Sequence, residues 1–219
     1  MSLQHRLDAF KVEFEAKVPG HAVAVMHRST NDLIASNQAG KAAKAGDVAP
    51  SFSLNDQDGN AVGLDDLLKA GPVVLTFYRG GWCAYCKMDL AALEAASADI
   101  RAKGATLVAI SPQTAANSRK SHKEIGLSFP ILSDAHGEVS DAYGLRFRLD
   151  DELIEVYKGF GVDLALVNGD PGWTLPMPSR FVIGQDGQIV YAEVNPDYTQ
   201  RPDPSELMPT LDRLRKHAA

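Results

Sequence analysis

The sequence VVLTFYRGGWCAYCK, residues 73–87, joins an apolar run to the only two cysteines of the 219-residue chain. The run predicts a buried strand, and the residues after it predict a turn followed by a helix that begins near Cys83. At a helix N-terminus, unpaired amide groups and the helix dipole favour a thiolate. Cys83 and Cys86 lie on one helical turn, within disulfide reach. The stretch therefore predicts a reactive dithiol.

Composition and charge exclude several classes of function. The net charge is −6, and no run of lysine and arginine predicts a nucleic-acid partner. Apolar runs are far shorter than the ~20 residues that span a membrane, and the N-terminus lacks the apolar core of a signal peptide. We therefore expect no membrane partner and a cytoplasmic location. In that reducing compartment a Cys-x-x-Cys pair is more often catalytic or metal-binding than structural.

A metal site is the less favoured of these two interpretations. A structural zinc site uses four ligands, and the chain has two cysteines. Its six histidines are scattered and form no pair at ligand spacing. The pair Gly80-Gly81 gives the backbone freedom at the turn before the dithiol. It is not a nucleotide-binding or phosphate-loop signature. The sequence thus predicts neither a metal nor an organic cofactor.

Residues 1–46 are predicted to form an N-terminal helical extension. A helix is predicted over 1–17, where apolar residues recur at helical spacing, and Pro19-Gly20 ends it. The rest of the extension has weak periodicity, which fits a segment wrapped on the body or on a partner subunit. Together with a long insertion at about 145–178, the extension suggests a homodimer.

Residues 47–219 are predicted to form one α/β domain. Strands and helices alternate, which predicts right-handed crossovers and a central mixed, mostly parallel sheet flanked by helices. The insertion precedes a last hairpin and a C-terminal helix. The predicted elements are a hairpin at 52–62, a helix at 65–68, strands at 73–78, 106–110 and 129–132, helices at 83–104, 114–125, 139–143 and 150–158, a hairpin at 180–194 and a helix after 204.

Several motifs carry a resemblance to a known family over roughly residues 47–215. The chain resembles the thioredoxin fold and, more closely, the peroxiredoxin-like branch of the alkyl hydroperoxide reductase and thiol-specific antioxidant (AhpC/TSA) family. The motifs are Ala49-Pro50-Ser51-Phe52-Ser53-Leu54 with Asp58-Gly59, the strand Leu75-Thr76-Phe77-Tyr78, the Gly-Gly-Trp-Cys-x-Tyr-Cys site, and Phe181-Val182-Ile183 with Asp186-Gly187.

The resemblance implies an antioxidant oxidoreductase. It implies a thiol-dependent peroxidase that reduces hydrogen peroxide or organic hydroperoxides through a Cys83/Cys86 dithiol–disulfide cycle. The implied reductant is thioredoxin or glutathione. The family carries a Pro-x-x-x-Thr-x-x-Cys motif, in which Arg79 takes the proline position, Cys83 the threonine position and Cys86 the peroxidatic position. The family's active-site arginine falls on Pro178, and Arg180 lies two residues further on.

The departures from the family motif resemble thioredoxin-like oxidoreductases instead. Trp-Cys-x-x-Cys-Lys is the active site of those proteins, and Pro178 lies where their cis-proline packs against the dithiol. The second hypothesis is therefore a thiol–disulfide oxidoreductase. Depth in the helix favours Cys83 as the nucleophile, whereas the family motif favours Cys86. A third hypothesis is a redox-sensing interaction module without turnover.

The residues around the dithiol have supporting roles in these hypotheses. Arg79 is predicted to face the site and to favour the thiolate. Trp82 and Tyr85 flank the cysteines, where they either form an apolar platform for a partner protein or simply pack. Trp173 is predicted to fill a small core of the insertion, and the polar run 197–201 is predicted to lie on the surface or in a dimer contact.

Overall fold

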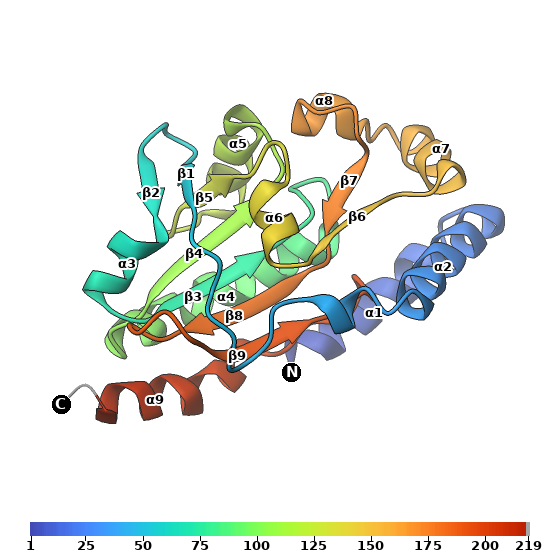
Figure 1. Ribbon diagram of the computed structural model, residues 1–219. Coiled ribbons are helices and arrows are strands. Elements are labelled where there is room, and N and C mark those ends of the chain that lie inside the picture. The colour runs from blue at the N-terminus through green and yellow to red at the C-terminus, as the bar shows by residue number, and fades with distance from the viewer. Residues whose placement is uncertain (218–219) are drawn as a thin grey trace.

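A five-stranded sheet forms the centre of the protein in a computed structural model that describes residues 1–217 (Figure 1). The last two residues of the predicted 47–219 domain lie outside this description. The strand order is β5–β4–β3–β8–β9. Strands β3, β4 and β5 run parallel, and the hairpin of β8 and β9 completes the sheet with antiparallel pairing. The strands are β3 (Val73–Phe77), β4 (Thr106–Ser111), β5 (Ile131–Ser133), β8 (Ser179–Ile183) and β9 (Ile189–Val194).

Strand β3 is central because all five of its residues are buried, as a strand covered on both faces requires. Successive side chains point to opposite faces of a sheet. Val74 accordingly joins a core with leucines of the helices on one face. Val73, Leu75 and Phe77 join a second core on the other face. The predicted mixed sheet with helices on both faces is confirmed, and parallel pairing is limited to β3, β4 and β5.

Helices cover both faces of the sheet (Figure 1). Leucines of α1, α4 and α9 belong to the first core, and residues of α3 and α6 belong to the second. Pro209 lies in the first turn of α9, where a missing N–H costs nothing. The helices are α1 (Leu3–Glu15), α2 (Gly20–Ala35), α3 (Leu64–Ala70), α4 (Ala84–Ala102), α5 (Ala115–Ile125), α6 (Glu138–Ala142), α7 (Asp151–Gly159), α8 (Leu164–Asn168) and α9 (Met208–His217), with 3-10 turns η1 (Ala39–Lys41) and η2 (Pro204–Leu207).

Two small sheets lie outside the central one. Strands β1 (Ser53–Asn55) and β2 (Ala61–Gly63) form the hairpin that the sequence predicted. Strands β6 (Arg146–Arg148) and β7 (Thr174–Pro176) pair at the two ends of the insertion and were not predicted. The second pair could not be predicted from local sequence patterns, because its strands are short and far apart in the chain.

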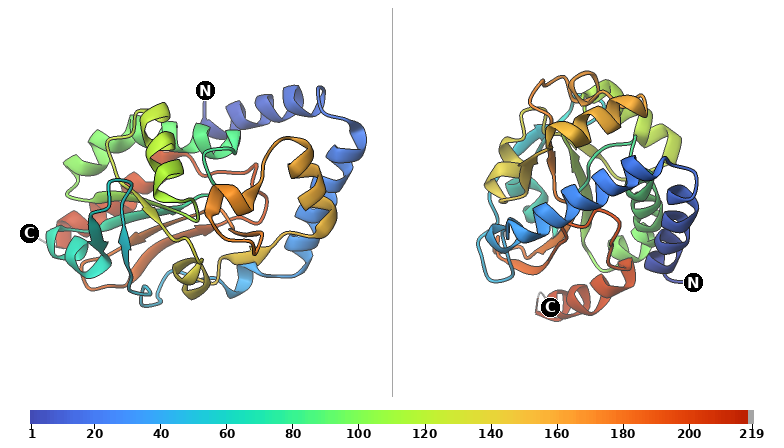
Figure 2. Two further views of the ribbon diagram at one scale, coloured as in Figure 1. Left: turned by 90° about the horizontal axis from the view of Figure 1, so that it is seen from above. Right: turned by 90° about the vertical axis from the view of Figure 1, so that its right-hand side faces the viewer.

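The N-terminal segment forms two helices that meet at a corner at one end of the molecule (Figure 2). The first was predicted, whereas α2 was not, although its buried residues Ala22 and Met26 lie four residues apart, on one face of a helix. Helix α1 packs against α4, and α2 packs against α7 of the insertion. The two segments that suggested a homodimer therefore contact each other and the body within one chain. The homodimer stays a prediction.

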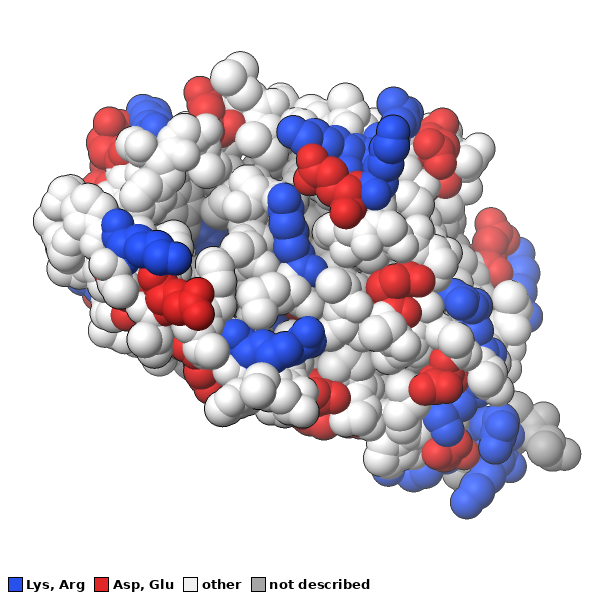
Figure 3. Space-filling view, turned by 180° about the vertical axis from the view of Figure 1, so that it is seen from behind, with Lys and Arg blue, Asp and Glu red and all other residues white. Residues whose placement is uncertain are grey.

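Positively and negatively charged side chains are intermingled on the surface. Figure 3 shows the face opposite to that of Figure 1, where lysine and arginine are intermingled with aspartate and glutamate, and where a hollow opens among uncharged residues. Within residues 1–217, no helix combines the length and the apolar composition that crossing a lipid bilayer would need.

The packing of α1 predicts that this helix contributes to global stability. Leu7 is fully buried in the first core, whereas Val12 on the same helix is 71% exposed. We expect Leu7→Ala to lower the free energy of unfolding by about 2–5 kcal/mol, because it leaves a cavity. Val12→Ala, as the matched control, should change it by less than about 0.5 kcal/mol. Urea denaturation of both variants measures the difference, and equal effects would contradict the docking of α1.

Candidate active site

The dithiol is positioned by a glycine-dependent turn after β3. Gly80 has a φ of 145°, which side chains disfavour, and a Cβ there would clash with the indole of Trp82. The turn leads Cys83 to the N-cap position of α4, with extended backbone angles. Cys86 follows one turn later on the same helix. The predicted strand, turn and helix around the cysteines are confirmed.

Both cysteines are free thiols, and both are buried, but their surroundings differ. Cys83 is 4% exposed and lines a cavity of about 230 Å³. Cys86 is fully buried behind it in the first core. A small molecule that enters the cavity therefore meets the sulfur of Cys83 first.

The cavity is walled by segments that are far apart in the chain. Phe10 and Phe14 come from α1, and Tyr157 comes from α7. Tyr198 comes from the loop after β9. The ring of Phe10 meets Tyr85 edge-on at 5.2 Å, and Tyr85 in turn meets Tyr198 at 5.5 Å. The wall is thus largely aromatic.

Arg79 is the one charged residue of this wall, and it is 3% exposed. Its guanidinium lies over the rings of Tyr198 at 4.1 Å, Trp82 at 5.0 Å and Tyr157 at 5.6 Å. It also donates a hydrogen bond to the Tyr157 hydroxyl. Burial raises the pKa of the Tyr157 and Tyr198 phenols, so both rings stay neutral near pH 7. Within residues 1–217, no carboxylate pairs with Arg79, and the arginine faces Cys83 as a buried cation.

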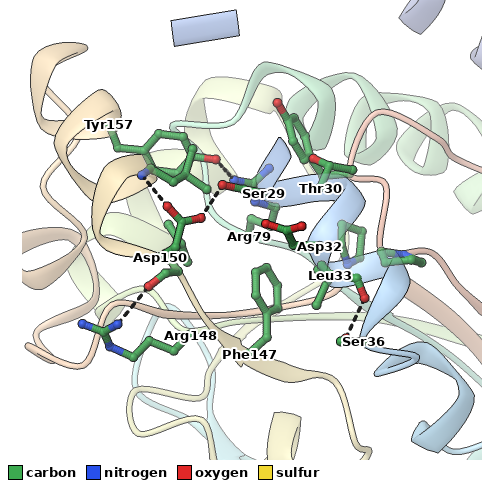
Figure 4. Close-up of a pocket in the computed structure, with 15 residues that line it drawn as sticks. Ser29, Thr30, Asp32, Leu33, Ser36, Arg79, Phe147, Arg148, Asp150 and Tyr157 are labelled. Atoms are coloured by element: carbon green, nitrogen blue, oxygen red, sulfur yellow. Dashed lines mark hydrogen bonds between the residues drawn. The ribbon is translucent and has the colours of Figure 1, made fainter. Parts of the chain in front are cut away.

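A second cavity of about 190 Å³ lies on the other side of Arg79 (Figure 4). Arg79, Tyr157 and Tyr198 line both cavities. The second cavity is more polar, and there Asp150 caps α7 and accepts a hydrogen bond from Ser29. No cysteine lines it, so the sulfur chemistry belongs to the first cavity.

The environment separates the pKa values of the two thiols. Hydrogen bonding from the Cys86 thiol and, to a lesser extent, the charges of Arg79 and Arg201 lower the pKa of Cys83 to about 6, against the opposing effect of burial. Burial raises the pKa of Cys86 well above its usual value, and the neighbouring Cys83 raises it further. Cys83 is therefore the sulfur that ionises more readily, and Cys86 is the one that holds its proton more strongly.

A buried network holds Cys86 from behind. Nη2 of Arg201 lies 3.6 Å from Sγ of Cys86. Nε of Arg201 lies 3.4 Å from Asp89, whose other oxygen lies 2.5 Å from Nη2 of Arg180. Arg180 also donates a hydrogen bond to the carbonyl of Pro202. Three buried charges thus share one network, in which Asp89 bridges the two arginines.

Some of the predicted supporting residues line the cavity with Cys83, and others do not. Arg79, Trp82 and Tyr85 line the cavity with Cys83, and Tyr85 is 5% exposed, so it packs inward and forms no platform for a partner protein. Arg180 is connected to Cys86 only through Asp89 and Arg201, and it does not line the cavity. Trp173 packs with the small core of the insertion, as predicted.

The prediction of a cis-proline at Pro178 is wrong. Residues 1–217 contain no cis peptide bond, so the bond before Pro178 is trans. Pro178 lies between β7 and β8 and lines the second cavity, on the side of Arg79 that has no cysteine. A trans bond at this position is a departure from the cis-proline of thioredoxin-like oxidoreductases.

Sequence analysis missed the apolar residues of the cavity wall and four polar residues of the site. The run 197–201 was predicted to be surface, yet it supplies Tyr198 to the cavity and Arg201 to Cys86, because the loop folds back under α1, where Gln4 binds the backbone of Arg201. No local pattern shows this contact. Asp89 carried a usable signal, since it lies three residues after Cys86 on the same face of α4. Tyr157 was predicted to lie in a helix and carried no further signal.

A family model described as the AhpC/TSA family matches residues 45–192. The chain belongs to the AhpC/TSA family. This AhpC/TSA protein is 35% identical over 152 residues to peroxiredoxin Q, chloroplastic, of Oryza sativa subsp. japonica, which covers 69% of the chain and 59% of the rice protein. It is 34% identical over 103 residues to peroxiredoxin Bcp of Escherichia coli (strain K12), which covers 47% of the chain and 65% of that protein. The chain therefore spans less than two thirds of the length of both relatives.

Solved structures show the same fold. The AhpC/TSA protein superposes on the peroxidoxin BcpB of Mycobacterium tuberculosis with a TM-score of 0.61 and 24% identity, over 78% of this chain and 97% of that one. It superposes on a variant of the peroxiredoxin 6 of Arenicola marina with a TM-score of 0.62 and 20% identity, over 80% and 75% of the two chains. The predicted thioredoxin fold of the peroxiredoxin kind is confirmed.

Metal ligation has no support in this site. Across residues 1–217, no three histidine, cysteine, aspartate or glutamate side chains are grouped to hold a metal ion. Asp89, the acidic residue behind the dithiol, is already shared by two arginines. What the arrangement can do is hold one thiolate beside a buried cation and a protonated second thiol.

The charge of Arg79 predicts the pH dependence of the thiolate. We expect the ultraviolet absorbance of the Cys83 thiolate, followed in Cys86→Ser protein, to appear as pH rises. Arg79→Gln in the same background should move the midpoint upward by about one pH unit or more, since it removes a positive charge that favours the thiolate. Arg119→Gln, which removes an exposed arginine, is the matched control. An unmoved midpoint in Arg79→Gln would contradict this electrostatic role.

Proposed function

We propose that this protein is a thiol-dependent peroxidase in which Cys83 attacks the peroxide. The observation that carries the proposal is the position of Cys83, a thiolate at the wall of a cavity that admits a small molecule, with 4% of its surface exposed. A peroxide fits such a cavity and reaches the sulfur directly, whereas another protein reaches the sulfur only when the cover over it opens. The family relationship supports the same chemistry.

The proposed cycle begins at the Cys83 thiolate. Its sulfur attacks the nearer oxygen of the peroxide, the O–O bond breaks, and the leaving oxygen departs as hydroxide or alkoxide and takes up a proton. Cys83 is then a sulfenic acid. The sulfur of Cys86 displaces its hydroxyl group as water, and a Cys83–Cys86 disulfide forms. The peroxide is reduced by two electrons, and the dithiol is oxidised by two.

The neighbouring charges have separate roles in this cycle. Arg79 faces the cavity, where its positive charge stabilises the thiolate and then the negative charge that develops on the leaving oxygen. Arg201 holds Cys86 from the opposite side at 3.6 Å. It favours the thiolate that Cys86 must form when it displaces water from Cys83. The two sulfurs are thus prepared for successive steps.

A thiol–disulfide oxidoreductase is the second candidate. Its supporting observation is the lowered pKa of Cys83, which hydrogen bonding from Cys86 favours at the start of a helix. The burial of both sulfurs and the trans bond before Pro178 speak against it. Reduction of insulin by a dithiol in the presence of catalytic amounts of this protein tests the candidate, and an absence of turnover would exclude it.

A redox-sensing interaction module is the candidate from another class. In that case the fold presents a surface, and the dithiol acts as a switch or not at all. A Cys83→Ser, Cys86→Ser double variant tests it, because full retention of function in cells would favour this module over both enzymes.

Reduction of the disulfide requires an external thiol, and we propose thioredoxin or glutathione. Both are thiol donors of a reducing cytoplasm, where we place the protein. Consumption of NADPH in the presence of each complete reductant system and peroxide discriminates between them. Fractionation of cells that express the full chain tests the location, and light scattering in solution tests the predicted homodimer.

Single cysteine variants test the proposed order of the two sulfurs. We expect Cys83→Ser to lose rapid oxidation by hydrogen peroxide, because the remaining Cys86 is protonated and does not line the cavity. Cys86→Ser should still react but should accumulate a sulfenic acid at Cys83. Stopped-flow mixing measures the rates, and mass spectrometry after trapping with dimedone locates the sulfenic acid.

Two outcomes would contradict this proposal in different ways. A rapidly formed sulfenic acid at Cys86 in Cys83→Ser protein would reverse the order of the sulfurs and restore the peroxidatic position of the family motif. Oxidation of the wild type no faster than that of free cysteine would overturn the peroxidase itself.

A further inference from the structure

A second oxidisable sulfur lies in the cavity beside Cys83. It belongs to Met26 of α2, which is 5% exposed and lines the same cavity as the nucleophile. All five methionines fall within residues 1–217, and Met26 is the one that lines this cavity. Helix α2 precedes the residues 45–192 that the family model matches. A peroxide that enters the cavity therefore meets two sulfurs, one from the matched domain and one from the N-terminal extension.

The surroundings of the Met26 sulfur favour the transfer of an oxygen atom to it. The hydroxyl of Tyr198 donates a hydrogen bond to Sδ of Met26 at 3.8 Å. The guanidinium of Arg79 lies 4.1 Å from the centre of the Tyr198 ring. A hydrogen-bond donor and a buried positive charge thus lie beside the sulfur, where they stabilise the negative charge that develops on a leaving oxygen. A thioether sulfur is a weak acceptor, so the Tyr198 hydroxyl binds the oxygen of a sulfoxide more strongly and favours the oxidised product.

Met26 also holds α2 against the insertion. Its side chain belongs to the apolar cluster that contains Leu153 and Tyr157 of α7. A sulfoxide is polar, and a polar group in an apolar cluster costs free energy unless all its hydrogen bonds are made. Oxidation of Met26 therefore loosens the packing of α2 on α7. Because Tyr157 binds Arg79, the change also reaches the charge that stabilises the Cys83 thiolate.

We propose that Met26 is a site of oxidation to methionine sulfoxide, and that this modification slows the enzyme when peroxide exceeds the supply of reductant. The inference rests on the proposed peroxidase function, which brings peroxide into this cavity. While the dithiol is reduced, Cys83 reacts first, because a thiolate is a much stronger nucleophile than a thioether. Once Cys83 and Cys86 are joined in a disulfide, Met26 is the reduced sulfur that remains in the cavity.

The modification transfers one oxygen atom. Sδ of Met26 attacks the hydroxyl oxygen of the peroxide, an S–O bond forms, and the O–O bond breaks. The transferred hydroxyl gives its proton to the leaving oxygen, which departs as water or as an alcohol. The sulfur is oxidised by two electrons, and the peroxide is reduced by two. A methionine sulfoxide reductase supplied with a dithiol reverses the change.

Peptide mass spectrometry measures the oxidation of each methionine in protein treated with excess hydrogen peroxide. We expect Met26 to be oxidised several times faster than Met177, the matched control, which is fully buried in the second core and does not line the cavity. Val162→Phe fills part of the cavity, so it should slow the oxidation of Met26 and leave that of the exposed Met1 unchanged. A continuous supply of dithiothreitol should delay the sulfoxide at Met26.

Two substitutions test the effect on activity. Met26→Leu removes the oxidisable sulfur, so the fraction of its own initial rate that survives peroxide treatment should exceed that of the wild type. Met26→Gln places a polar group in the apolar cluster without any peroxide, so it should slow the oxidation of Cys83 and lower the melting temperature by roughly 2–4 °C or more. Treatment of the oxidised wild type with methionine sulfoxide reductase and dithiothreitol should restore its rate.

The outcomes separate this inference from the peroxidase itself. Rapid oxidation of Cys83 together with a Met26 that is oxidised no faster than Met177 would overturn the modification site and leave the peroxidase standing. Equal losses of rate in Met26→Leu and the wild type would overturn the control of activity by Met26. Oxidation of Met26 without oxidation of Cys83 by any peroxide would overturn the peroxidase, and with it the regulation.

Discussion

The burial of the Arg79 guanidinium is the constraint on which the site depends. A cation removed from water is costly unless rings, hydrogen bonds or an anion compensate it. Here Trp82, Tyr157 and Tyr198 supply the rings, Tyr157 supplies a hydroxyl, and Cys83 supplies the anion when it is ionised. The thiolate and the arginine thus stabilise each other, and the aromatic layer that excludes water strengthens their attraction.

This constraint explains why the site draws on so many segments. A dithiol on the first turn of a helix would by itself leave Cys83 at the surface. The N-terminal helices, the insertion and the loop after β9 cover it instead, and each contributes at least one ring to the layer around Arg79 and Cys83. Because of this cover, only a molecule that enters the cavity reaches the sulfur of Cys83. Cys86 lies behind Cys83 and does not line the cavity.

The central fold and the dithiol could be predicted because their signals are local. The buried run 73–78, the turn at Gly80-Gly81 and the two cysteines specify a strand, a turn and a helix without reference to distant residues. The contacts that complete the site are different, because Tyr198 and Arg201 meet the cysteines over more than one hundred positions in sequence, as the separation of 115 between Cys86 and Arg201 shows. The cis-proline prediction failed because the isomer of an X–Pro bond is set by tertiary packing, which the local sequence does not show.

The pairing of Cys86 with Arg201 also has a consequence for the order of synthesis. The ribosome makes the dithiol 115 residues before the arginine that covers it, and domains fold as units once their segments are available. Gln4 and Leu3 at the beginning of the chain bind Arg201 and Asp203, so the first helix also waits for the last loop before it can dock in full. The nascent protein therefore carries two uncovered thiols for most of its translation, and it acquires its protected redox centre only when the two ends of the chain meet.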